Sequence, residues 1–79
     1  MTIHLQYFAI LREQAGCGRE TLTTEASDAV TLYSEVAAKH GFSLSPAQIR
    51  LAIDNEYQPM DTPLTDGMLL TFIPPVAGG

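Results

Sequence analysis

The sequence is poor in the residue types that mark several common classes of small protein. It has one cysteine, no tryptophan, and four basic residues against nine acidic ones, for a net charge of -5. A lone cysteine excludes an internal disulfide, and the shortage of basic residues argues against direct binding to nucleic acid. No apolar run approaches the roughly 20 residues of a membrane-spanning helix, and the N-terminus lacks the pattern of a signal peptide. We therefore expect a cytoplasmic protein that binds neither nucleic acid nor membrane.

What is present fits one small globular domain. The 79 residues are 46% hydrophobic and 16% charged, which is enough apolar surface for a single core. The acidic surface suits a basic docking groove on another protein, although it is equally explained as an aid to solubility.

Hydrophobic periodicity predicts the elements. Residues 2–8 alternate between apolar and polar, which predicts a strand with Ile3, Leu5 and Tyr7 on its buried face. Apolar residues spaced by three and four predict a main helix over 28–40, with Asp28 at its start and Gly41 at its end. The other expected elements are a short helix over 9–15, a loop over 42–48, and strands over 19–24, 49–53, 56–60 and 68–73.

The same pattern predicts which side chains face inward. On the main helix we expect one apolar stripe, formed by Val30, Tyr33, Val36, Ala37 and His40. In the short helix we expect Ile10, Leu11 and Gln14 to point toward the core. The predicted core consists of Leu5, Val30, Tyr33, Val36, Leu51, Ile53, Leu70 and Phe72.

This order of elements favours an α+β roll, in which a mixed sheet of about five strands packs on one main helix. The first and last strands are the most apolar, so we expect them side by side in the middle of the sheet. Phe8 and Ile73 then point away from the core on adjacent strands. Exposed apolar residues of this kind mark protein interfaces when they cluster, but singly they are ordinary.

Candidate groups for catalysis or metal binding are few. His4, His40 and Cys17 are scattered and lack the spacing of zinc ligands. Cys17 lies between two glycines and is expected to be exposed, and His40 suits the positions at the end of a helix. We expect no bound metal or cofactor, which leaves the α-carboxylate of Gly79 as the group with chemical potential.

The last six residues are unusual for the end of a domain. Pro74 and Pro75 favour an extended course, and Val76 and Ala77 are small and apolar. Gly78 and Gly79 have no Cβ, so they fit a slot too narrow for other residues. We therefore divide the chain into a domain over 1–73 and an extended tail over 74–79; the alternative is a frayed end.

Three stretches resemble the small subunit of molybdopterin synthase, a ubiquitin-like sulfur carrier with the β-grasp fold. They are Tyr7-Phe8-Ala9 followed by Leu11-Arg12-Glu13, then residues 63–67 (PLTDG), then residues 72–79 (FIPPVAGG). The double proline before the glycines is the most specific part. Residues 17–56 carry little of the resemblance.

The resemblance implies a cycle in which this chain is a co-substrate and its partners do the catalysis. An E1-like adenylyltransferase adenylates Gly79 with ATP, and a sulfurtransferase or cysteine desulfurase supplies sulfur, which leaves a C-terminal thiocarboxylate. The tail then enters the large subunit of molybdopterin synthase and donates its sulfur to cyclic pyranopterin monophosphate. The resemblance also implies that Tyr57 joins Phe8 and Ile73 in a patch that binds the partner.

Three alternatives stay open at this point. The first is a sulfur carrier for another pathway, such as thiamine synthesis, tRNA thiolation or cysteine synthesis. The second is a protein modifier attached to lysines through Gly79. The third is a β-grasp binding module with no covalent chemistry.

Overall fold

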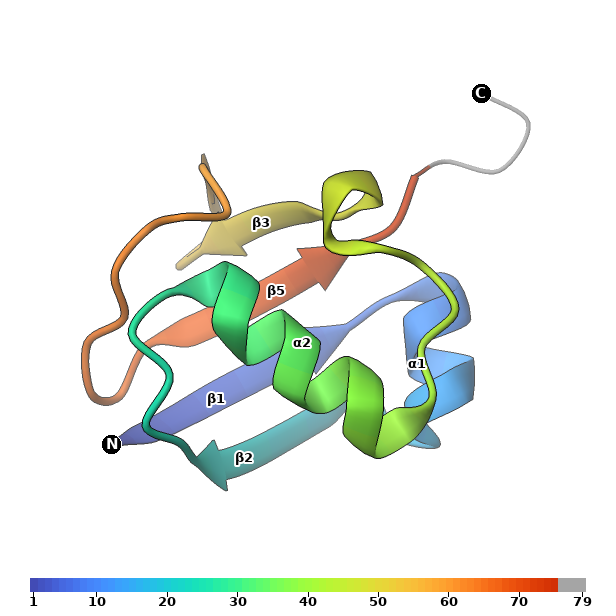
Figure 1. The fold of residues 1–79 in the computed structure, drawn as a ribbon, viewed down its shortest axis with the longest axis horizontal. Helices are drawn as coiled ribbons and strands as arrows, with labels where there is room; N and C mark the ends of the chain where they lie inside the picture. The colour runs from blue at the N-terminus through green and yellow to red at the C-terminus, as the bar shows by residue number, and fades with distance from the viewer. Residues whose placement is uncertain (76–79) are drawn as a thin grey trace.

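The computed structural model describes residues 1–75, which form one mixed sheet and two α-helices (Figure 1). The elements are β1 (Thr2–Tyr7), α1 (Ala9–Ala15), β2 (Arg19–Thr23), α2 (Ala29–His40), the 3₁₀ turn η1 (Pro46–Gln48), β3 (Arg50–Ile53), β4 (Glu56–Gln58) and β5 (Leu69–Ile73). They agree with the predicted elements to within two residues. The predicted loop over 42–48 contains η1, where the Ser45 N–H donates to the Gln48 side chain at 3.0 Å.

The strand order is β2-β1-β5-β3-β4. β1 and β5 pair in parallel, and the pairs β1–β2, β3–β5 and β3–β4 are antiparallel. The prediction that the first and last strands lie side by side is confirmed, as is the α+β roll.

The core lies between α2 and the face of the sheet that α2 crosses (Figure 1). Tyr33 of α2 meets Phe72 of β5 edge to face, with ring centroids 5.1 Å apart, and Phe42 contacts Tyr7 in the same way at 5.4 Å. Such aromatic pairs add to the hydrophobic effect. Of the predicted core residues, all except Val30 are buried.

The two helices correct two expectations about burial. Val30 is half-buried, because the buried face of α2 is instead formed by Ala29, Leu32, Tyr33 and Val36. These follow the i, i+3, i+4, i+7 spacing of one helix face, and Val30 lies at its flank. Ile10 of α1 is 38% exposed, and its neighbour Leu11 fills the inward position.

α2 begins and ends as the sequence predicts. The Asp28 carboxylate accepts a hydrogen bond from the Thr31 N–H at 2.9 Å, which satisfies a free donor of the first turn. Gly41 closes the helix in a left-handed conformation with φ 73°, where a side chain would be strained. No helix within residues 1–75 is long and apolar enough to cross a membrane.

Candidate functional site

The parallel pairing of β1 and β5 brings two exposed apolar positions together. Tyr7 lies opposite Phe72 in the register, and both are buried. Since side chains alternate along a strand, the next residues, Phe8 and Ile73, turn toward the outer face of the sheet, away from α2. Phe8 is 44% exposed and Ile73 is half-buried.

The hairpin of β3 and β4 brings Tyr57 to the same face. Its turn is Asp54-Asn55, with φ 49° and 71°. Positive φ at both central residues is typical of the tight turns that match strand twist, and Asp and Asn tolerate it better than most residues. The turn sets Tyr57 opposite Ala52, and its side chain is 67% exposed.

One row of residues connects these positions across the outer face. In the register Gln6 lies opposite Thr71, Thr71 opposite Ala52, and Ala52 opposite Tyr57. Thr71 and Ala52 are nearly covered by their neighbours, at 5% and 8% exposed.

Phe8, Tyr57 and Ile73 line a single shallow hollow of about 240 Å³ on this face, which we call the outer-face hollow. Gln6, Thr71 and Ala52 of the row just described form its floor, and Asn55 completes its rim. The structure therefore brings together the three residues that the sequence predicts for a partner-binding patch. The polar floor was missed, although the alternation of outward residues on neighbouring strands would have located it.

The tail leaves the sheet beside this hollow. β5 ends at Ile73, and Pro74 follows as a buried residue, whereas Pro75 is exposed. Val76, Ala77, Gly78 and Gly79 lie outside the described residues, so their predicted role in entering partner enzymes stays a prediction.

Four ionisable side chains form one structural cluster between the sheet and the end of α2. Glu20 of β2 accepts hydrogen bonds from Tyr7 at 2.7 Å, Lys39 at 2.6 Å and His40 at 2.8 Å. Burial opposes its ionisation, but the hydrogen bonds from His40, Lys39 and Tyr7 outweigh burial and lower the pKa of Glu20 to about 2. Burial and the adjacent Glu20 raise the pKa of the Tyr7 hydroxyl above its ordinary value.

The histidines and the cysteine considered as metal ligands or catalytic groups do not come together in one site among the described residues. Within residues 1–75 no group of three or more His, Cys, Asp or Glu side chains is placed to hold a metal ion. Cys17 is half-buried and packs against the core, rather than exposed as expected. Gly16 ends α1 in a left-handed conformation, and the Gly18 carbonyl accepts a hydrogen bond from the Tyr7 N–H at 2.9 Å, which holds this segment against β1. His40 is committed to Glu20 at the end of α2, as its sequence position suggested.

Comparison with known proteins yields one family and a set of similar structures. The sequence pattern of the ThiS family matches residues 5–79. No curated protein resembles the sequence closely enough to count as a match.

Solved structures of about this size share the fold. SAMP1 from Haloferax volcanii is 20% identical, with a TM-score of 0.78 over 100% of both chains. A protein from Pyrococcus furiosus, described as subunit 1 of a molybdopterin converting factor, is 24% identical, with a TM-score of 0.76 over 96% of this chain and 99% of its own. A complex of subunits 1 and 2 of the molybdopterin-converting factor from Helicobacter pylori contains a chain that is 22% identical, with a TM-score of 0.67 over 100% of both chains. The predicted ubiquitin-like β-grasp fold is thereby confirmed.

Proposed function

The chain belongs to the ThiS family of ubiquitin-like sulfur carriers and modifiers, and from this premise we propose that it is the sulfur-carrying small subunit of a molybdopterin synthase. In this role Gly79 carries sulfur as a C-terminal thiocarboxylate. The acceptor is cyclic pyranopterin monophosphate, held by the large subunit. The proposal places this cycle in the cytoplasm.

The chemistry requires a partner to activate Gly79. A carboxylate resists nucleophiles because it is anionic and stabilised by resonance. Attack of the carboxylate on the α-phosphate of ATP forms an acyl-adenylate and releases pyrophosphate. The terminal sulfur of a persulfide on the sulfur-donating enzyme then attacks the acyl carbon and AMP leaves, which gives an acyl disulfide. A second thiol attacks the enzyme-side sulfur, breaks the S–S bond, releases the thiocarboxylate of Gly79 and forms a disulfide. We assign these steps to an E1-like adenylyltransferase and to a sulfurtransferase or cysteine desulfurase, and we propose that this chain itself binds no cofactor.

The observation that carries the proposal is the position of the outer-face hollow relative to the tail. Phe8 and Ile73 stand at adjacent ends of parallel strands, and the chain continues from Ile73 directly into the two prolines. A protein that covers Phe8, Ile73 and Tyr57 is therefore positioned to receive the residues that follow Pro75. The Helicobacter pylori structure is a complex of subunits 1 and 2, which supports a large subunit as that protein.

A second candidate function is attachment to other proteins through Gly79. It is favoured by the similarity to SAMP1, a small archaeal modifier protein. Isopeptide-linked conjugates on a denaturing gel would indicate this function, whereas a carrier yields none.

The length of the tail provides a direct test of the carrier function. We expect that one residue added after Gly79, or deletion of Gly79, abolishes sulfur loading. The deletion leaves the terminal acyl carbon short of the site of adenylation, and the added residue carries it past that site. Circular dichroism and thermal melting of both variants should match those of the unaltered protein. One residue added before Met1 is the matched control and should leave loading intact. Normal loading of either tail variant would contradict the proposal.

The acceptor is tested separately. The loaded protein, mixed with the large subunit and cyclic pyranopterin monophosphate, should yield molybdopterin. If the loaded protein gives no molybdopterin with an active large subunit, the chain belongs to another sulfur-transfer pathway.

A further inference from the structure

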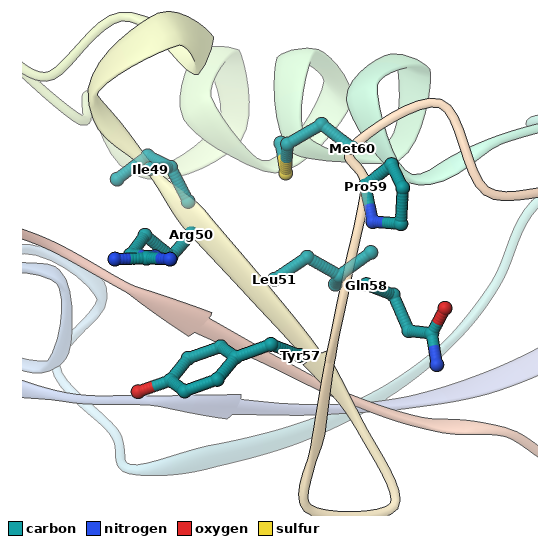
Figure 2. A pocket seen from close by; sticks show the side chains of 7 residues that line it. All are labelled: Ile49, Arg50, Leu51, Tyr57, Gln58, Pro59 and Met60. Atoms are coloured by element: carbon teal, nitrogen blue, oxygen red, sulfur yellow. The ribbon is translucent and has the colours of Figure 1, made fainter.

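A second, larger hollow of about 410 Å³ lies at the edge of the sheet, where β4 separates from β3 (Figure 2). β4 pairs with β3 only as far as Gln58, which lies opposite Leu51. Beyond Gln58 the chain turns away through Pro59 to Met60, whose carbonyl accepts a hydrogen bond from the Val30 N–H at 2.8 Å. The divergence of the two segments opens the hollow, which we call the edge hollow.

The edge hollow has an apolar floor and a polar rim. Ile49 and Leu51 are buried beneath it, and the Met60 side chain points into it from the opposite segment (Figure 2). Arg50 and Tyr57 are exposed on the rim. An apolar recess with a cation beside it is suited to an apolar side chain that has an acidic neighbour.

Arg50 is held in place and has no carboxylate partner among residues 1–75. Its guanidinium carbon lies 5.0 Å from the centroid of the Tyr57 ring, a cation–π contact that restricts the side chain. The ion pairs formed among residues 1–75 both involve Glu20, with Lys39 and His40. A stacked guanidinium keeps its N–H edges available for two parallel hydrogen bonds to a carboxylate.

The position of Arg50 connects it to the proposed docking surface. Arg50 lies opposite Ile73 in the register of β3 and β5, so it stands next to the point where the tail leaves the sheet. Tyr57 lines both hollows. The two hollows are therefore adjacent, and one partner surface can cover both.

We propose that the edge hollow is a second docking site for the large subunit, which inserts an apolar side chain and pairs a neighbouring carboxylate with Arg50. This inference rests on the proposed function and specifies the chemistry of its partner. The chain has nine acidic and four basic residues, so its net charge favours basic surfaces on a partner. A carboxylate that pairs with Arg50 is the opposite arrangement. Such a local inversion fixes the orientation of the two proteins and disfavours partners that lack the carboxylate.

The test measures the affinity of the full-length variants for the large subunit from the same organism by calorimetry at low and high salt. Arg50→Gln should weaken binding about fivefold to 30-fold at low salt, because a charge-assisted contact is lost, and Arg50→Glu should weaken it further through repulsion. Arg50→Lys should recover part of the loss. Arg19→Gln, which removes an exposed arginine from β2 at the opposite edge of the sheet, is the matched control and should change affinity less than twofold.

The salt dependence of the affinity distinguishes an ion pair at Arg50 from a structural role in which Arg50 only holds the Tyr57 ring. A carboxylate contact is screened, so the difference between the unaltered protein and Arg50→Gln should shrink at high salt. The inference would be overturned if Arg50→Gln binds as tightly as the unaltered protein. It would also be overturned if Arg50→Glu binds no more weakly than Arg50→Gln and high salt does not reduce the loss. Either result would leave the proposed function standing. Absence of binding by the unaltered protein would contradict the proposed function, and the inference with it.

Discussion

At the scale of single residues, Phe8 has a position that packing alone does not explain. It follows a strand whose inward residues are buried, and it caps α1 with an extended backbone. The next residue, Ala9, has φ 50°, a conformation that costs a residue with a Cβ roughly 1 kcal/mol or more. This sharp turn ends β1 and leaves the Phe8 ring on the outer face, where it lines the outer-face hollow.

We predict that Phe8→Ala weakens binding to the large subunit by more than about 1 kcal/mol, as truncation of a buried aromatic anchor does. Ile10→Ala is the matched control, because Ile10 is similarly exposed on the adjoining helix but does not line the hollow. Calorimetry on both variants measures the difference. Equal affinities for Phe8→Ala and the unaltered protein would remove the outer-face hollow from the docking surface.

At the scale of elements, Glu20 joins three parts of the fold. It projects from β2 and receives hydrogen bonds from β1 through Tyr7 and from the last turn of α2 through Lys39 and His40. Each bond to a charged group stabilises the fold more than a neutral one does. The carboxylate therefore fixes the end of the helix against the edge of the sheet.

The depressed pKa of Glu20 makes part of the stability depend on pH. The pKa falls from 4.5 to about 2 on folding, so the contribution is present above about pH 5 and is lost as the pH falls toward 2. Glu20→Gln should reduce the free energy of unfolding by about 1 to 2 kcal/mol at neutral pH, a range that allows for partial solvent screening.

Chemical denaturation between pH 2 and pH 7 checks this, and the difference between the two proteins should shrink toward the acidic end. Glu13→Gln, on the exposed side of α1, should cost little across the same range. A difference for Glu20→Gln that is constant with pH would show that the carboxylate charge is not what matters.

Sequence patterns predicted the elements well because the strong signals were local. The alternation in β1, the Asp28 start and the Gly41 end of α2 each depend on a few neighbouring residues. Burial was harder to predict where the choice lay between adjacent apolar residues. Ala29 and Val30 are both apolar, and only the complete i, i+3, i+4, i+7 set identifies Ala29 as the inward one.

At the scale of the whole molecule, the described residues present two adjoining hollows. The outer-face hollow and the edge hollow share Tyr57 and adjoin the end of β5. Phe8 and Ile73 of the first hollow were predicted from the sequence, because alternation shows which residues point outward, whereas Tyr57 was expected only from the family resemblance. The edge hollow was not predicted, because it arises where β4 leaves β3, and that divergence is a property of the tertiary structure.

We propose that the chemistry takes place at Gly79 and that partner enzymes supply the catalysis. The decisive experiment is an intact-mass measurement after incubation of the protein with ATP, an E1-like adenylyltransferase and a sulfur donor. We predict a mass gain of one oxygen-to-sulfur exchange that requires ATP and that fragmentation locates to Gly79. If the mass stays unchanged while the same activating enzyme loads its own carrier under the same conditions, Gly79 of this chain is not a site of sulfur loading.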